Sequence, residues 1–177
     1  MEKEIVTGYH WFWAWEDEKE ENWLGEMSAR GWHLESLGFP GIYHFKCGEP
    51  RPFVYRMDFN SPRLNNREEY FRLFSDSGWE YIGKQGGWKY FRKEKNPGET
   101  SEIFTDRDSK ADKYRRLLAY LACLLPLMIL LLTRSGNDNF HLAGWWEVIK
   151  GVSFALYIIY IYALVKIWLR IRQLKKG

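Results

Sequence analysis

Two long apolar stretches near the C-terminus constrain this chain most. Residues 117–133 carry no charged side chain, and residues 148–169 carry lysines only near their ends, at Lys150 and Lys166. A helix that crosses a bilayer needs roughly 20 apolar residues, and basic side chains at its ends extend toward the head groups. We therefore expect two transmembrane helices joined by the short segment 134–147, with a helix buried in a soluble core as the alternative.

Basic residues flank both apolar stretches and predict their orientation. Between the two uncharged runs the only basic residues are Arg134 and Lys150. By the positive-inside rule, both termini then lie in the cytosol and segment 134–147 lies outside, so we expect a multi-pass protein of the cell membrane. The basic residues assigned to the cytosolic side are Lys110, Lys113, Arg115, Arg116, Lys166, Arg170, Arg172, Lys175 and Lys176.

The second apolar stretch carries large side chains at helical spacing. Residues three and four apart share one face of a helix, so these side chains form a continuous seam. Three neighbours are compatible with the seam: the first helix, a second copy of the chain in a homo-oligomer, or lipid. The residues of the seam are Phe154, Tyr157, Ile161, Leu164 and Trp168.

Charge separates the chain into an acidic part and a basic part. Residues 1–109 contain 15 Lys and Arg against 20 Asp and Glu, whereas residues 110–177 contain 11 against 3. A basic segment beside apolar stretches suits anionic lipid head groups, whereas an acidic surface repels nucleic-acid phosphates. We therefore expect the lipid bilayer as a partner and no nucleic acid. Cys47 and Cys123 suggest no disulfide framework, and the polar N-terminus does not resemble a signal peptide.

Self-comparison of the N-terminal region indicates an internal repeat. WLGEMSARGWHL at 23–34 aligns without gaps on YFRLFSDSGWEY at 70–81, and GIYHFK at 41–46 aligns on GWKYFR at 87–92. Because these landmarks keep their order, we infer a tandem duplication. The two copies are expected at about 9–47 and 53–93.

Each copy carries the same expected order of elements. An alternating aromatic stretch, at 9–15 and at 53–59, is typical of a strand. A helix follows and ends at Gly31 or Gly78, because a helix stop favours a residue that tolerates a left-handed backbone. A hairpin closes each copy. The sequence therefore predicts the α+β class: a tandem βαββ repeat that forms one sheet with both helices on one face, followed by the two-helix transmembrane hairpin.

The boundaries of the expected parts follow from composition. The repeats make a cytosolic head, residues 1–95, and a polar segment with Pro97 and Gly98 follows it. Asp106 or Ser109 can cap a charged helix that continues into the first apolar stretch. The parts after the head are a linker with a juxtamembrane helix at 96–116, transmembrane helices at 117–133 and 148–169 around the external loop at 134–147, and a basic cytosolic tail at 170–177.

Aromatic residues are the feature of the head that most suggests function. The chain holds 10 Trp, 11 Tyr and 11 Phe, more than a head of this size ordinarily needs. Aromatic side chains outside the core can line a ligand cleft or a protein interface, although a core built from large residues would also explain them. The residues predicted to form a ligand or partner surface are Trp11, Trp13, Trp15, Tyr55, Trp88 and Tyr90.

No set of residues points to catalysis or to a bound metal. The sequence contains no phosphate-binding glycine loop with its lysine, no HExxH and no paired CxxC. His33, His44 and Cys47 fall in one hairpin, but His44 and Cys47 are three residues apart on one strand and so point to opposite faces. We therefore predict no catalytic residues, no metal and no cofactor.

Charged residues in the head have structural interpretations. Five acids lie near the start of the first expected helix, where the helix dipole stabilises negative charge and a divalent-ion site is the less favoured alternative. Arg56 and Asp58 lie on one strand, where ion pairing is favoured over an open polar patch. The five acids are Glu16, Asp17, Glu18, Glu20 and Glu21.

Four segments together resemble a known family. WAWEDEKEENWLGEMSARGWHL, VYRMDF, GWEYIGKQGGWKYFRK and EIFTDRDSK are similar to the bacterial membrane proteins grouped as domain of unknown function 2812. The resemblance covers nearly all of the head and implies no enzyme activity and no site residues. Such proteins are often encoded beside PadR-like transcriptional regulators, and this association implies a role in signalling or stress response.

Two hypotheses for the function follow. In the first, the chain is a membrane-anchored sensory or adaptor protein whose aromatic-rich head binds a protein or a small apolar ligand. In the second, it is an accessory subunit of a membrane transporter or membrane enzyme, assembled through the transmembrane hairpin. An enzyme is the least favoured class, because the sequence shows no catalytic motif.

Overall fold

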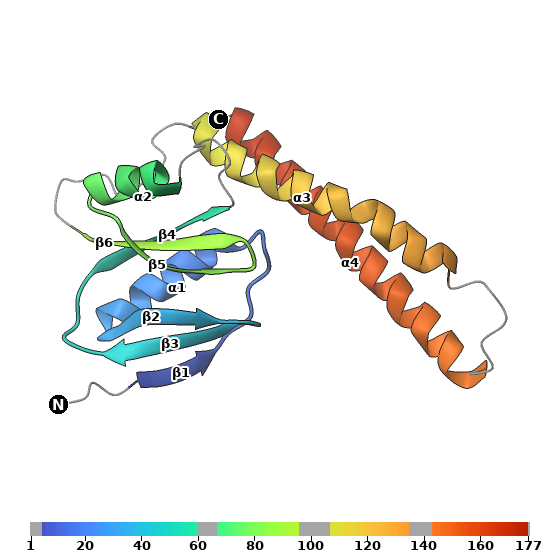
Figure 1. Ribbon diagram of the computed structural model, residues 1–177, viewed down its shortest axis with the longest axis horizontal. Coiled ribbons are helices and arrows are strands. Elements are labelled where there is room, and N and C mark those ends of the chain that lie inside the picture. The colour runs from blue at the N-terminus through green and yellow to red at the C-terminus, as the bar shows by residue number, and fades with distance from the viewer. Residues whose placement is uncertain (1–4, 60–66, 96–106, 135–142, 177) are drawn as a thin grey trace. The chain divides into compact units, whose positions relative to one another are not determined.

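The computed structural model describes residues 5–59, 67–95, 107–134 and 143–176. The chain divides into two compact units, Met1–Ser109, which contains the head, and Lys110–Gly177, here called the helical unit. Mixed α and β structure is confirmed: the described residues form six strands and four helices (Figure 1).

Both sequence repeats fold with the same order of elements. The first contains β1 (Ile5–Tyr9), α1 (Asp17–Ala29), β2 (Trp32–Gly38) and β3 (Ile42–Cys47), and the second contains β4 (Phe53–Phe59), α2 (Arg67–Asp76), β5 (Glu80–Gln85) and β6 (Trp88–Glu94). In each repeat the last strand lies in the middle of an antiparallel sheet, with orders β1-β3-β2 and β4-β6-β5. Both hairpins also carry a bulge at the same place, after Leu34 and after Tyr81.

The prediction of one continuous sheet is wrong, because the strands form two separate three-stranded sheets. Strand β2 lies next to β5, but the two strands do not pair through their backbones. Side chains from the second repeat bind the backbone of β2 instead. The Tyr55 hydroxyl lies 3.4 Å from the Leu34 amide, which donates to it, and Gln85 Nε2 donates to the Gly38 carbonyl at 2.8 Å. Side chains therefore bind the backbone at this junction, and β2 and β5 form no ladder with each other.

The two helices do not share one face of a sheet, as the sequence had predicted. Helix α1 packs against β2 of its own repeat and β4 of the other, whereas α2 packs against β5 (Figure 1). The buried side of α1 carries Asp17, Glu20, Glu21, Leu24 and Ser28, which recur at helical spacing. Helix α1 therefore joins the two repeats.

The first strand is also placed differently from the prediction. Strand β1 spans Ile5–Tyr9 rather than the aromatic stretch 9–15. It pairs with β3 from Ile5 opposite Lys46 to Tyr9 opposite Ile42, and the His10 amide then donates to the Gly41 carbonyl. Because β3 begins at Ile42, directly after the hairpin turn, the chain beyond His10 has no strand to pair with.

Aromatic rings make most of the core of the second repeat. Tyr70 and Phe74 of α2 pack with Trp79 and with Phe91 of β6, all at most 6% exposed. The Phe74 and Phe91 rings are stacked, with centroids 4.3 Å apart. A core built from large residues, which the sequence analysis weighed against a binding surface, thus accounts for this part of the aromatic content.

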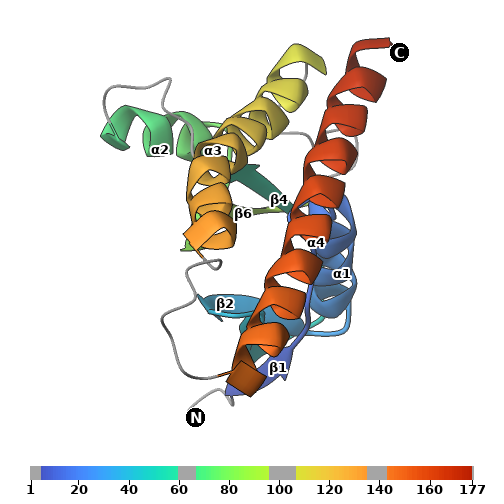
Figure 2. The ribbon, with the colours of Figure 1, turned by 90° about the vertical axis from the view of Figure 1, so that its right-hand side faces the viewer.

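The helical unit contains α3 (Arg107–Arg134) and α4 (Ala143–Lys176), which run antiparallel (Figures 1 and 2). The Tyr160 hydroxyl of α4 donates to the Leu121 carbonyl of α3, so the helices touch there. Helix α3 begins before the predicted stretch 117–133 and continues through Pro126. Helix α4 begins at Ala143, before the predicted start at residue 148, and residues 135–142 of the predicted loop lie outside the described part of the chain.

The side of α4 that is least exposed forms a heptad-like stripe. Its members are three or four residues apart, the spacing of a seam between two helices. Three residues of the predicted seam, Phe154, Ile161 and Trp168, lie off this stripe and are 63%, 37% and 46% exposed. The stripe consists of the half-buried Ser153, Tyr157, Tyr160 and Leu164 and the buried Ile167 and Ile171.

Gly31 should tolerate substitution far less than Gly86. Both have positive φ, +89° and +56°, so alanine at either site costs about 1–2 kcal/mol from the left-handed backbone alone. A Cβ on Gly31 would lie 2.5 Å from the Gly48 carbonyl oxygen, whereas a Cβ on Gly86 meets nothing within 4 Å. Urea unfolding of the two alanine variants should show the larger loss of stability for Gly31→Ala, and equal losses would contradict the close approach.

Candidate functional site

The predicted surface residues Trp11, Trp13 and Trp15 lie together in the connection between β1 and α1. Trp11 is 49% exposed and Trp13 is 41% exposed. The Trp13 and Trp15 rings are stacked with centroids 5.2 Å apart, and the Trp11 ring meets the Trp13 ring edge-on at 6.0 Å. These three side chains, here called the tryptophan surface, form a continuous aromatic surface that solvent reaches.

The other three predicted residues are buried. Tyr55, Trp88 and Tyr90 are 1%, 6% and 3% exposed and belong to the core of the head. Tyr55 binds the Leu34 amide, and Trp88 packs edge-on against Phe59 with centroids 5.2 Å apart. The six residues therefore do not form one surface, and only the three tryptophans remain candidates for contact with a partner.

The segment that carries the tryptophan surface is held in place from both sides. The Glu16 carboxylate accepts the Trp13 amide at 3.2 Å, and the Glu16 amide donates to the Trp13 carbonyl at 2.8 Å. Lys19 donates to the same carboxylate at 2.6 Å, which lowers the pKa of Glu16. On the inner side, the stacked rings of His10 and Phe12 rest against Trp23 of α1. The tryptophan surface is thus a preformed feature.

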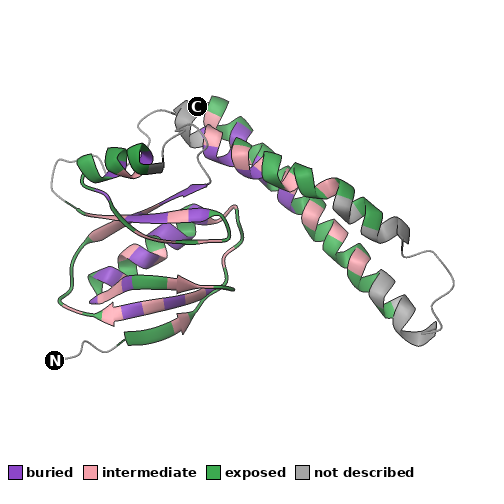
Figure 3. Cartoon of the chain, viewed as in Figure 1, coloured by how far each residue is buried: buried purple, intermediate pink, exposed green. Residues whose placement is uncertain are grey.

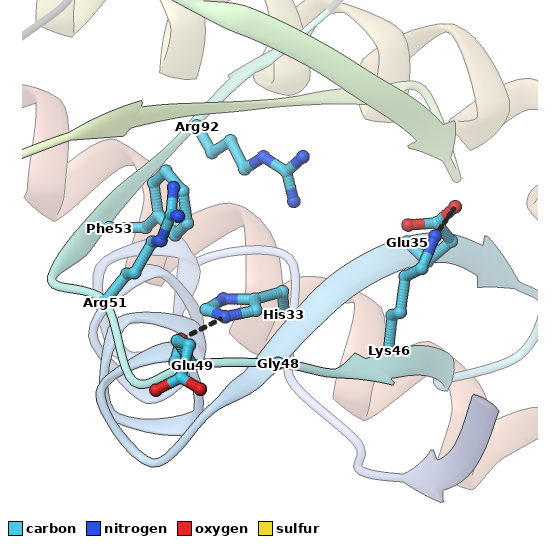
Figure 4. A pocket seen from close by; sticks show the side chains of 8 residues that line it. All are labelled: His33, Glu35, Lys46, Gly48, Glu49, Arg51, Phe53 and Arg92. Carbon is cyan, nitrogen blue, oxygen red and sulfur yellow. Dashed lines mark hydrogen bonds and ion pairs between the residues drawn. The ribbon is translucent and has the colours of Figure 1, made fainter. Parts of the chain in front are cut away.

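A cleft of about 300 Å³ lies where the two repeats meet (Figure 4). Its wall includes residues of β2, β3, β4 and β6 and the connection between the repeats. A cleft of this size is at the lower limit for small-molecule sites. The residues that line it are His33, Glu35, Lys46, Gly48, Glu49, Arg51, Phe53 and Arg92.

Hydrogen bonds fix the connection that forms one side of the cleft. His33 Nε2 lies 2.8 Å from the Glu49 carbonyl oxygen, which can only accept, so this nitrogen carries the proton. The other ring nitrogen lies 2.7 Å from the hydroxyl of the fully buried Ser28. The Arg51 amide donates to the Ser28 carbonyl at 3.2 Å. His33, the residue weighed as a metal ligand, here links α1 to the segment between the repeats.

The most buried cation of the cleft is already paired. Arg92 donates to both carboxylate oxygens of Glu80, at 2.7 and 2.9 Å, and to the Leu34 carbonyl at 3.2 Å. Burial disfavours the charge, yet the bonds to Glu80 outweigh it and raise the pKa of Arg92. Lys46 and Glu35 approach to 3.8 Å. Several polar groups of the cleft are already paired, and charged residues line much of it, so the cleft does not resemble a site for a small apolar ligand.

Three buried acids have a structural role that the sequence analysis missed. Glu20 accepts the hydroxyls of Tyr43 and Tyr90 on one oxygen, at 2.7 and 2.6 Å, and so joins α1 to both sheets. Glu21 accepts the Met57 amide at 2.8 Å, and Asp58 accepts the Tyr70 hydroxyl at 2.8 Å. For Glu20 and Glu21 the detectable signal was the helical spacing that places them on the same face as Leu24 and Ser28.

Other charged and metal-capable residues are placed as follows. Arg56 forms an ion pair at 3.3 Å with Glu21 of helix α1, whereas Asp58 accepts a hydrogen bond from Tyr70. His44 Nδ1 lies 2.9 Å from the Thr7 hydroxyl, and Cys47 is exposed. Within the described ranges no group of three or more His, Cys, Asp or Glu residues could hold a metal ion.

Burial raises the pKa of Glu20, although the two tyrosine hydroxyls oppose the shift. Burial likewise raises the pKa of Tyr43 and of Tyr90, and the charge of Glu20 acts in the same direction. One Glu20 carboxylate oxygen thus accepts two tyrosine hydroxyls, one from each repeat. The arrangement links α1 to the central strands of both sheets.

Replacing Glu20 with glutamine should change how stability depends on pH. The pKa of Glu20 in the folded chain lies above its ordinary value of 4.5. Protonation of Glu20 therefore contributes fully to the stability of the fold below pH 4.5, and this contribution is lost as the pH rises through the raised pKa. Glutamine cannot titrate, so wild type should lose stability relative to Glu20→Gln as pH rises toward 8. Urea unfolding across this range measures it, with the exposed Glu18→Gln as control, and a constant difference would contradict the assignment.

Comparison with known proteins finds one family. The family model described as "Protein of unknown function (DUF2812)" matches residues 16–126, more than half of the chain. The match includes α1, both hairpins and the first part of α3. Neither the curated proteins nor the solved structures contain a match to the chain.

Proposed function

We propose a role for this chain, which belongs to the DUF2812 family of proteins of unknown function: it is a membrane-anchored adaptor whose head binds a protein partner. The observation that carries the proposal is the apolar surface of α4. Gly151–Lys175 is the one helical segment in the described part of the chain that is long and apolar enough to cross a membrane. The tryptophan surface supplies the second feature, a surface for contact.

The low burial of its apolar side chains distinguishes this helix from the core helix of a soluble protein. A core helix would bury most of its apolar side chains, whereas only 11% of the most apolar window of α4 is buried (Figure 3). Exposed apolar surface of this extent indicates contact with lipid or with another protein. The large side chains exposed along α4 include Val152, Phe154, Leu156, Ile158, Ile159, Tyr162, Val165 and Trp168.

Helix α3 supports a second crossing and a transmembrane hairpin. Residues 117–133 carry no charge, and α3 meets α4 at the bond between Leu121 and Tyr160. Together with the basic residues before α3 and at the end of α4, this supports a multi-pass protein with both termini in the cytosol. The head then lies in the cytosol, where a membrane-anchored adaptor meets soluble partners.

A protein is the partner class that best fits the head. Exposed tryptophans on a rigid support are typical of protein interfaces, because a large ring is buried with little loss of conformational freedom. A small apolar ligand would need an enclosed apolar cavity, and the cleft between the repeats is lined mainly by charged residues. The proposed activity is binding, with no reaction step.

The cysteines of the chain allow a direct test of topology. In the Cys123→Ser variant the exposed Cys47 is the one remaining cysteine. A membrane-impermeant maleimide should label it only after the cells are opened. In a Cys47→Ser, Cys123→Ser background, Asn137→Cys in the predicted external loop should be labelled in intact cells. Labelling of Cys47 in intact cells, with Asn137→Cys protected, would contradict the proposed orientation.

The tryptophan surface can be tested by substitution and crosslinking. Trp11→Ala with Trp13→Ala should remove partner proteins that co-purify from detergent extracts, while Leu73→Ala, at a residue of α2 that is 60% exposed, should not. A photoreactive amino acid at position 13 should form adducts that the same residue at position 73 does not form. Because the tryptophans are partly exposed, stability should change by no more than about 1 kcal/mol. Identical partners and adducts would rule out this surface.

An accessory subunit of a membrane complex is the second candidate. Phe154, Ile161 and Trp168 recur at seven-residue spacing and are exposed, so they can face another membrane protein. Exchange of residues 107–176 for an unrelated helical hairpin separates the two candidates. An adaptor that acts through its head should keep its function after the exchange, and an accessory subunit should lose it.

A further inference from the structure

The outer edges of β1 and β4 are equivalent positions in the two repeats. Thr7 pairs with His44 directly after the bulge of the first hairpin, and Met57 pairs with Tyr90 directly after the bulge of the second. Thr7 and Met57 therefore occupy the same place in the two sheets. The Met57 amide has a hydrogen-bond acceptor on this outer edge, so the Thr7 amide at the equivalent position needs one as well.

At β4 the outer edge is covered by helix α1. Glu21 Oε1 accepts the Met57 amide at 2.8 Å. One turn further along α1, a Cβ built on Gly25 would lie only 3.4 Å from the Phe53 carbonyl oxygen. Alternate residues of an antiparallel edge strand direct their backbone groups away from the sheet, and at β4 these are Phe53, Tyr55 and Met57.

At β1 the corresponding edge is open. By equivalence with Met57, the outward backbone groups belong to Ile5, Thr7 and Tyr9, and the bond from the His10 amide to the Gly41 carbonyl confirms that even-numbered residues face β3. Strand β1 is terminal in its sheet (Figure 1). Over residues 5–59 and 67–95, no helix packs against β1 and no side chain binds its outward amides.

The side chains of β1 do not protect this edge. Natural edge strands avoid pairing by means of charge, proline or bulges, and IVTGY has no charge, no proline and no bulge in its register with β3. Ile5 and Tyr9 are 60% and 68% exposed. An open, uncharged edge with exposed apolar side chains is a site for addition of another strand.

We propose that the added strand is β1 of a second copy of this chain, paired antiparallel about a twofold axis at Thr7. This pairing joins two three-stranded sheets into one of six strands. It places Ile5 opposite the partner's Tyr9, which is a favourable cross-strand pair of a β-branched and an aromatic side chain. A charge at the axis residue would face its own copy across the pair, and the axis residue of β1 is the uncharged Thr7. This contact is independent of the tryptophan surface and of any other partner.

Charge placed at Thr7 tests the twofold axis directly. Lysine is tolerated on a monomeric edge strand, but in the dimer Thr7→Lys sets two lysines opposite each other. In detergent, light scattering should show wild type as a dimer, and Thr7→Lys and Thr7→Glu each as a monomer. An equimolar mixture of the two variants should form dimers again, which a misfolded chain could not do. A monomeric wild type, or variants that remain dimeric alone, would overturn the proposal.

A crosslink at the same residue gives a second measurement. Directly opposed residues in an antiparallel pair have Cα atoms about 4.5–5.5 Å apart, within the range that a disulfide spans. In the Cys47→Ser, Cys123→Ser background, Thr7→Cys should oxidise to a covalent dimer at least about tenfold faster than Lys84→Cys, an exposed control on β5. Equal rates would show that the contact lies elsewhere, for example in the helical unit, and would overturn the proposed pairing of β1.

Discussion

The bond of one buried carboxylate to two tyrosines holds the head together. Glu20 lies on the first helix, and its hydroxyl donors Tyr43 and Tyr90 lie in the central strands of the two sheets. Burial of a carboxylate is costly unless strong donors surround it, so this site favours the arrangement in which all three elements meet. The cleft, the paired Arg92 and the fixed connection between the repeats depend on that arrangement.

The same junction makes the two repeats unequal. Helix α1 covers the edge of β4 through Glu21, and α2 covers no equivalent edge of β1. In the first repeat the helix provides the acid and a strand provides the tyrosine, whereas in the second Tyr70 of the helix donates to Asp58 of a strand. Duplication thus produced one repeat with a protected edge and one with an open edge. The open edge and the tryptophan surface adjoin each other in the chain, at residues 5–15.

Prediction from the sequence succeeded where the signal was local. The helix stops at Gly31 and Gly78, the two hairpins and the strand at 53–59 follow from turn chemistry and short periodic patterns. It failed for the aromatic stretch 9–15, because alternation alone does not show whether a neighbouring strand is available. Prediction also grouped six aromatic residues into one surface. In the structure Trp11 and Trp13 are exposed whereas Tyr55, Trp88 and Tyr90 are buried, and this difference depends on the whole fold.

The sequence by itself determined the order of elements, the repeat, the family and the apolar character of the C-terminal helices, since each depends on residues close together in the chain. Tertiary structure alone decided that the strands form two sheets, that α1 crosses between repeats and which hydroxyls bind Glu20. These outcomes depend on partners such as Tyr90, which lies 70 residues from Glu20. Local periodicity cannot encode which distant donors satisfy a buried charge, because the fold brings them together.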